Sequence, residues 1–251
     1  ATLYYAKDLQ EIYLNTKFYN NRTLDPCAPV TIVSGALFSS EDNDAADYWN
    51  QVIDAGRNQL AWDWMHQNAG GWPYDGVGYH VYVGQGAAAT TASVAAATQT
   101  NLDGVWAAVS ARDDQAAAKR LWITEFGWTI DQVSADQQAQ FLTAAFATYA
   151  ANSNVAAAFW FTYQDFPNGR YGLFDADGLA AANRRPDYAS FTGAVANYAP
   201  ALAARFDGVD APASMAAGET RTVTLAVHDA GGAAWSAADQ VRLGAAPGCP
   251  A

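Results

Sequence analysis

Short apolar runs that alternate with helical segments constrain the fold of this chain more than any other feature of its sequence. Four runs rich in β-branched and aromatic residues have the length and composition of buried strands, and segments with helical spacing separate them. The expected strands are 30–37, 75–83, 121–125 and 155–161. Continuous apolar strands joined by helices pair in parallel, with helices covering the sheet. The pattern predicts an α/β fold, and a doubly wound open sheet and a (β/α)8 barrel both satisfy it.

The helical segments carry start and stop signals. Asp25-Pro26 follows the first segment, and the residue before a proline avoids the helical region. Gly70-Gly71 ends the second segment in the manner of a left-handed cap, and Ser134 to Gln137 resembles a capping box. The expected helices are 3–19, 45–68, 87–118, 134–151 and 185–198.

Charge and aromatic content narrow the choice of ligand. The chain has 251 residues and a formal net charge of −12, which argues against nucleic acid or an anionic membrane as a partner. No stretch approaches the roughly 18 apolar residues of a membrane span. Thirteen Tyr, eleven Phe and nine Trp suit a neutral, polar ligand with faces that stack on rings, such as a sugar.

Neither metal nor nucleotide chemistry has a sequence signal. Cys27 and Cys249 lack metal-like spacing, although a disulfide between them is possible, and His66, His80 and His228 are scattered. No glycine-rich phosphate loop follows any expected strand. We therefore expect no metal and no cofactor.

Glu125 is the most unusual residue of the expected strands. It is one of only four Glu in the chain, and it ends the apolar run that begins at Leu121. A carboxylate placed there without a neighbouring cation is costly if buried. It is either a solvated residue at a capped strand end or a catalytic carboxylate at the C-terminal end of a parallel strand.

The residues around the expected strand ends resemble one enzyme family. Ile123-Thr124-Glu125-Phe126-Gly127-Trp128, Gly78-Tyr79-His80-Val81-Tyr82 and Phe159-Trp160-Phe161 are similar to the last strands of the retaining (β/α)8 glycoside hydrolases of clan A, the cellulase-like family 5 and family 39 types. Tyr171 to Gly178, followed by Arg185-Pro186, is similar to their closing loop and last helix. The resemblance covers about residues 1–198.

The resemblance implies a role for each matched residue. Glu125 would be the nucleophile, Tyr82 would donate a hydrogen bond to it, and His80 would orient that carboxylate or a sugar hydroxyl. Trp160 would form the floor of the sugar subsite. Further candidates for substrate binding are the ring platforms Trp128 and Tyr163 and the polar residues Gln164, Asp165 and Arg170. Ordinary core packing is the competing interpretation for His80, Trp160, Trp128 and Tyr163.

The resemblance also implies how the chain is divided. Residues 30–37 would be the fifth barrel strand, so 1–200 would be the C-terminal half of a TIM barrel holding strands 5–8. The second carboxyl group, the acid/base, follows the fourth strand in these enzymes and would therefore lie upstream of Ala1. Glu11 is expected on a solvated helix face and does not replace it. Residues 201–251 would be a truncated Ig-like β-sandwich module. Within it, residues 220–228 alternate polar and apolar side chains like a half-exposed antiparallel strand, Gly231-Gly232 is expected to form a turn, and Trp235 and residues 241–243 continue the strand pattern.

Two functions follow as expectations. The first is a secreted, extracellular glycosidase that acts on a β-linked poly- or oligosaccharide by the retaining mechanism, with this chain alone inactive. The alternative is a non-catalytic carbohydrate-binding or degenerate barrel. Neither interpretation predicts the oligomeric state.

Overall fold

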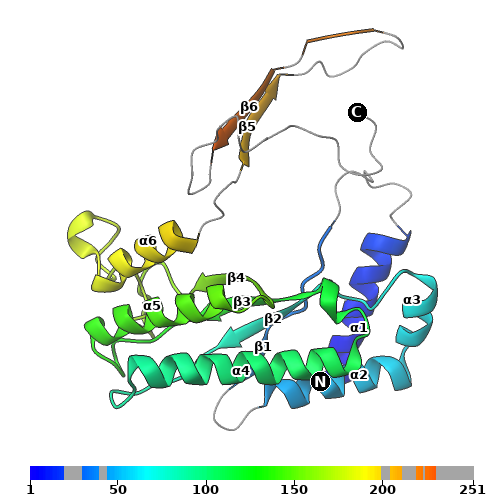
Figure 1. Cartoon of the computed structure of the whole chain (residues 1–251), viewed down its shortest axis with the longest axis horizontal. Helices are drawn as coiled ribbons and strands as arrows, with labels where there is room; N and C mark the ends of the chain where they lie inside the picture. The colour runs from blue at the N-terminus through cyan, green and yellow to red at the C-terminus, as the bar shows by residue number, and fades with distance from the viewer. Residues whose placement is uncertain (20–29, 40–43, 199–203, 211–218, 223, 230–251) are drawn as a thin grey trace.

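The computed structural model describes residues 1–19, 30–39, 44–198, 204–210, 219–222 and 224–229. Helices and strands alternate through most of these residues (Figure 1). The helices are α1 (Thr2–Tyr13, continued by a π-helical segment at Leu14–Tyr19), α2 (Ala45–Gln59), α3 (Trp62–Asn68), α4 (Thr91–Arg112), α5 (Ala135–Ala151) and α6 (Pro186–Tyr198), with short 3-10 segments at Ala116–Ala118 and Ala181–Asn183. The strands are β1 (Leu37–Ser39), β2 (Gly76–Val81), β3 (Arg120–Phe126), β4 (Val155–Trp160), β5 (Ala204–Asp210) and β6 (Thr224–Asp229).

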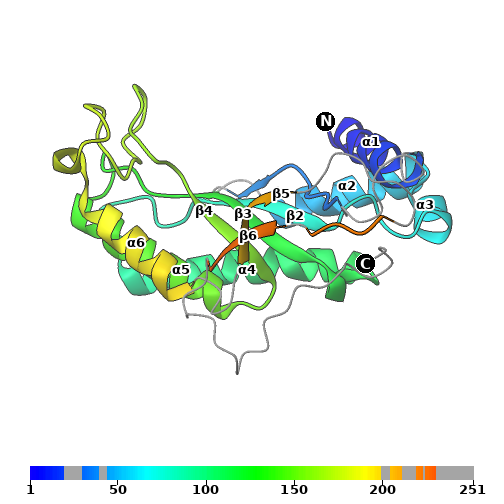
Figure 2. The same ribbon diagram turned by 90° about the horizontal axis from the view of Figure 1, so that it is seen from above.

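The first four strands form one parallel sheet in the order β1-β2-β3-β4. This confirms the predicted α/β fold. Spatial order follows chain order without the reversal that defines a doubly wound sheet. The pairs α1–α2, α2–α4, α4–α5 and α5–α6 are in contact, so the main helices form a continuous row along the sheet (Figures 1 and 2).

Side-chain caps begin three of the helices. Ser134 accepts from the Gln137 amide while the Gln137 side chain accepts from the Ser134 amide, so the predicted capping box is confirmed. Thr90 and Ser93 form the same motif at α4, and the Asp44 carboxylate caps α2. These caps satisfy amides that lack partners within their own helix.

Three predicted elements differ from the structure. The helix expected at 87–118 is α-helical only at Thr91–Arg112, because the backbone is extended at Asp113. The strand expected at 30–37 is regular only at Leu37–Ser39, because the Gly78 amide bonds the Ser34 hydroxyl instead of a backbone carbonyl. The helix expected at 45–68 divides into α2 and α3 at Leu60, whose backbone is extended. The division lets Trp62 pack on Gly56, where an added Cβ would lie 2.2 Å from the Trp62 ring.

An aromatic hub holds β3 against the helices. The Phe126 ring lies edge-on to four other rings at centroid distances of 4.9–6.3 Å. These rings belong to Trp128, Phe146, Tyr149 and Trp160. Trp72 and Tyr74 are buried in the same core. The hub therefore anchors the C-terminal end of β3.

The C-terminal region contains an antiparallel pair, β5–β6. The alternating segment predicted at 220–228 forms β6 at Thr224–Asp229, and its partner β5 was not predicted. The expected turn at Gly231-Gly232, the later strand residues and both cysteines lie outside the described residues. None of the described helices has the length and apolarity needed to cross a membrane.

Candidate active site

Glu125, Tyr82 and His80 meet at the C-terminal ends of β2 and β3. The Tyr82 hydroxyl donates to Glu125 Oε2 at 2.9 Å, and His80 Nδ1 lies 3.4 Å from the same oxygen. The parallel register places His80 directly opposite Glu125. About a third of the Glu125 side chain is exposed (34%), so the carboxylate is accessible from solvent while held by two neighbours. The structure thus brings together the three residues expected to be catalytic.

The phenol of Tyr82 is held in its protonated form. Burial raises the pKa of Tyr82 well above its ordinary value, and the hydrogen bond to Glu125 and the nearby negative charge raise it further. Each of these effects disfavours a phenolate beside a carboxylate. Tyr82 is therefore a hydrogen-bond donor to Glu125 at any pH near neutral.

Two reciprocal hydrogen bonds tie the loops that follow β2 and β3. The Trp128 indole donates to the Val83 carbonyl at 2.6 Å, and the Gln85 amide donates to the Gly127 carbonyl at 2.8 Å. A Cβ at Gly127 would lie 2.4 Å from the Phe161 carbonyl oxygen, so only glycine fits where the ends of β3 and β4 approach. These contacts fix the backbone on both sides of the Tyr82–Glu125 pair.

One predicted ring platform, Trp128, is contradicted by its burial, and the other, Trp160, packs in the aromatic hub. Trp128 is 1% exposed and packs between Phe126 and Phe141, so its faces are not available to a sugar. Trp160 lies opposite Phe126 in the β3–β4 pairing, and its ring packs in the aromatic hub 5.4 Å from that of Phe126. Successive strand residues face opposite sides, so this is the face away from Glu125. For Trp128 the core-packing interpretation holds, and the partly buried Trp160 ring contacts the hub.

The polar candidates after β4 hold the loop together. The Asp165 side chain is 3% exposed, pairs with Arg185 and accepts from the Gly172 amide, so it is not a hydroxyl-binding residue. Gln164 donates to the Asp175 carbonyl at 3.2 Å. Arg170 donates to Asp131 at 2.6 Å with about half of its side chain exposed.

Tyr163 keeps an accessible ring. It is 56% exposed and lies 5.0 Å from the Phe174 ring, so it stays a candidate platform.

Sequence reasoning missed two rings that flank Tyr82 and a third that packs on one of them. Phe38 lies 6.0 Å and Tyr171 6.3 Å from the Tyr82 ring, and Phe161 lies 5.5 Å from Tyr171. Strand alternation carried a signal for Phe161, because it neighbours Trp160 on the opposite face. Tyr171 lay within the recognised closing loop but had no assigned role. Together with Glu125 these rings give a carboxylate flanked by apolar, stackable surface.

The donor set does not suit a metal. Among the described residues, no three His, Cys, Asp or Glu side chains are grouped so that they could hold an ion. The site can instead offer an accessible carboxylate, two polar neighbours and aromatic faces.

Comparison with known proteins gives a family match. The profile of the family described as "glycosyl hydrolase catalytic core" matches residues 40–184, which include the three strands β2, β3 and β4 and the residues around Glu125. No curated protein matches the sequence.

Comparison with solved structures finds partial matches that share little sequence with this chain. A β-glucuronidase from an uncultured Clostridium sp. is 15% identical with a TM-score of 0.40, over 77% of this chain and 35% of that one. An arabinofuranosidase of family 51 from Xanthomonas axonopodis pv. citri is 13% identical with a TM-score of 0.47, over 76% and 38%. An endo-β-1,3-glucanase of family 128 from Amycolatopsis mediterranei is 20% identical with a TM-score of 0.36, over 59% and 63%. The chain thus covers less than two thirds of each of these structures.

Proposed function

The chain belongs to the glycosyl hydrolase catalytic-core family, and from that premise we propose that it carries the nucleophile half of a retaining glycosidase active site. Glu125 is the nucleophile in this proposal. The observation that supports it is the accessible carboxylate at the end of β3 that accepts a hydrogen bond from Tyr82 and lies beside His80. The substrate class is a β-linked poly- or oligosaccharide.

The proposed reaction is a double displacement. A Glu125 oxygen attacks the anomeric carbon, the bond to the leaving oxygen breaks, and a covalent glycosyl-enzyme forms that water then hydrolyses. Tyr82 and His80 hold the carboxylate in the orientation for attack, and Tyr82 stabilises its charge. The leaving oxygen needs a proton from a second carboxyl group about 5–5.5 Å from the nucleophile. We place that group on a segment upstream of Ala1.

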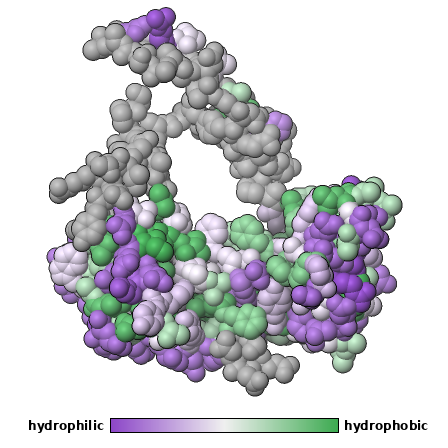
Figure 3. Space-filling model, turned by 180° about the vertical axis from the view of Figure 1, so that it is seen from behind, coloured by the Kyte–Doolittle hydropathy of each residue, from purple (hydrophilic) through white to green (hydrophobic). Residues whose placement is uncertain are grey.

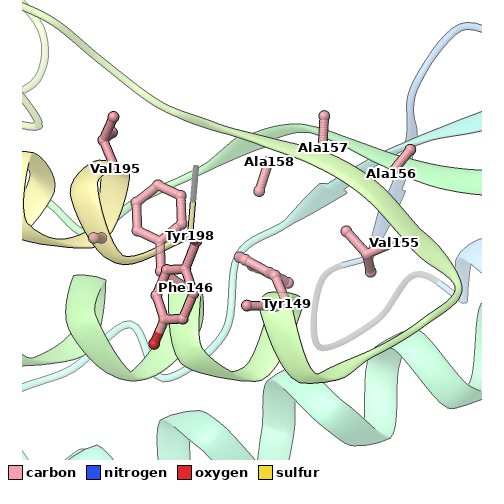
Figure 4. A pocket seen from close by; sticks show the side chains of 10 residues that line it. Phe146, Tyr149, Val155, Ala156, Ala157, Ala158, Val195 and Tyr198 are labelled. Atoms are coloured by element: carbon pink, nitrogen blue, oxygen red, sulfur yellow. The ribbon is translucent and has the colours of Figure 1, made fainter. Parts of the chain in front are cut away.

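We further propose that the parallel sheet is half of a (β/α)8 barrel. In the described part of the chain, β1 pairs only with β2 and β4 only with β3, so each has an open edge. An apolar groove of about 570 Å³ lies beside β4, lined by β4, α5 and α6 residues such as Phe146, Tyr149 and Tyr198 (Figure 4). Strands 1–4 of the barrel would cover these surfaces.

Exposed apolar side chains support the same proposal. Phe159 on β4 is 51% exposed, and Val195 and Tyr198 on α6 are 49% and 46% exposed. In the space-filling view, hydrophobic residues form patches among hydrophilic ones on the visible face (Figure 3). Apolar surface of this kind is typical of a face that another segment covers. Residues 1–200 would be the half-barrel, residues 201–251 a truncated Ig-like module, and the whole protein secreted.

The test is Glu125→Gln in the natural protein that contains this chain. We expect hydrolysis of β-glycans to fall by at least about 10³-fold, because the amide cannot form the glycosyl-enzyme. Glu11→Gln is the matched control, since Glu11 is an exposed helix residue paired with Lys7. Mass spectrometry after incubation with a 2-deoxy-2-fluoro glycoside should find the trapped sugar on Glu125.

Other outcomes separate the alternative function. Near-normal turnover by Glu125→Gln would remove the nucleophile assignment. Glycan binding without turnover by the wild-type protein would instead favour a non-catalytic carbohydrate-binding barrel.

A further inference from the structure

The loop between β4 and α6 presents an aromatic ring on a tight turn. The Phe166 and Gly169 amides each bond the other residue's carbonyl, at 3.2 and 3.1 Å, so Pro167-Asn168 forms the tip. A Cβ at Gly169 would lie 2.7 Å from the Phe166 ring and 3.0 Å from the Tyr171 ring, so this glycine allows both rings to approach the turn. The loop projects at the end of the molecule opposite α1 and α3 (Figures 1 and 2).

Phe166 belongs to a continuous series of rings that begins at Glu125. The Phe166 ring is parallel to that of Tyr171, with an interplanar angle of 4° and centroids 6.3 Å apart. The Tyr171 ring is edge-on to Tyr82 at 6.3 Å, and Tyr82 donates to Glu125. Phe161 lies beneath the series, 5.7 Å from Phe166 and 5.5 Å from Tyr171. Phe166 is 38% exposed at the outer end.

The foot of the loop is anchored before any ligand binds. The buried Asp165 carboxylate pairs with Arg185 at the start of α6 and accepts from the Gly172 amide at 2.8 Å. Arg170, next to Tyr171, pairs with Asp131 of the β3–α5 loop. Rings that folding has already ordered lose little further entropy when they bind a ligand.

We propose that Phe166 and Tyr171 form a second sugar-stacking subsite, separate from the sugar bound at Glu125, and that the substrate is therefore a saccharide chain rather than a single-sugar glycoside. A pyranose offers an apolar C–H face to an aromatic ring, and its hydroxyls then point toward polar groups at the rim. Arg170 and Asp131, each about half exposed, supply such groups beside Tyr171. This inference rests on the proposed function of the Glu125 site and adds a requirement for substrate length.

The test compares long and short substrates in the natural protein that contains this chain. Cellohexaose, laminarihexaose, mannohexaose and xylohexaose are assayed beside the 4-nitrophenyl β-glycosides of the same sugars. For Phe166→Ala we expect kcat/KM on the hexasaccharide that is cleaved to fall about tenfold, with the 4-nitrophenyl glycoside changed less than twofold. Phe166→Trp should restore the hexasaccharide rate, and Trp64→Ala, which removes a half-exposed ring on α3, should change neither rate.

Each result decides the proposal. An equal loss on both substrates, or no loss on either, would overturn the subsite. If the wild-type protein hydrolyses none of the probes, calorimetry with the four hexasaccharides gives the answer: about tenfold weaker binding by Phe166→Ala supports the subsite, and unchanged or absent binding rejects it. Failure of the nucleophile assignment is seen separately, as turnover that survives Glu125→Gln.

Discussion

At the scale of single residues, the candidate site depends on one hydrogen bond. Tyr82 donates to Glu125 Oε2 and keeps its proton, because burial and the adjacent carboxylate both raise the pKa of the phenol. A hydrogen bond to a charged group contributes about 1.5–3 kcal/mol, more than a neutral one. The position of the carboxylate therefore depends on the Tyr82 hydroxyl more than on any packing contact nearby.

Removing that hydroxyl should slow the reaction. We expect Tyr82→Phe to lower kcat about 10- to 100-fold with a smaller change in KM, because the bond orients and stabilises the attacking carboxylate. Tyr79→Phe is the matched control: it lies on the same strand and loses a hydrogen bond to Asn101, 2.9 Å long, away from Glu125. Steady-state kinetics give kcat and KM for both variants. An equal loss of kcat in Tyr79→Phe would show that the loss in Tyr82→Phe is a structural effect.

At the scale of elements, a buried carboxyl group at the start of α6 makes the stability of the fold depend on pH. Asp187, in the first turn of α6, is fully buried. Burial raises the pKa of Asp187 from 3.8 to about 7; Arg185 lowers it, and Asp165 adds to the rise. The folded chain therefore holds a proton on Asp187 that the unfolded chain loses above about pH 4.

This linkage has a definite sign. As the pH rises from about 4 to 7, the unfolded state releases the proton first, so the free energy of unfolding falls. We expect the stability of Asp187→Asn, measured relative to wild type, to be greater at pH 8 than at pH 4 by roughly 4 kcal/mol. Urea denaturation at both pH values measures it, with the exposed Asp177→Asn as the control. If the relative stability of Asp177→Asn changed between pH 4 and pH 8 as much as that of Asp187→Asn, the effect would not be specific to Asp187.

Sequence patterns predicted the elements better than the directions of their side chains. The strands around Glu125 and the meeting of Glu125, His80 and Tyr82 follow from apolar runs, parallel order and the resemblance. The side of the sheet that Trp160 faces could not be predicted from the sequence, because the β3–β4 pairing changes register between Ile123 and Phe126. The burial of Asp165 was also hidden, since its partner Arg185 is twenty residues away in sequence. Local alternation cannot show a bulge or a distant ion pair.

At the scale of the whole molecule, two features of the described residues belong together: the edges of β1 and β4 that no described strand pairs with, and the groove beside β4. Unpaired strand edges and exposed apolar groups favour association with another chain. In the proposed half-barrel, the upstream strands would occupy these surfaces and bring the second carboxyl group to Glu125. Hydrolysis and solubility would then both require the upstream strands.

Separating the two halves should therefore abolish hydrolysis. We expect residues 1–251 alone to show no measurable turnover, and co-expression with the upstream segment to restore it. Activity assays combined with analytical ultracentrifugation provide the measurement. Robust turnover by the isolated chain, independent of its concentration, would contradict the half-barrel proposal.

Phe126, the centre of the aromatic hub, is the residue next to Glu125, and the two side chains leave opposite faces of β3. One peptide unit thus joins the central ring of the hub to the carboxylate proposed to do the chemistry. A substitution that shifts the ring also shifts the carboxylate. Heat resistance and turnover cannot be selected independently on this strand, so a search for thermostable variants would have to begin well away from β3.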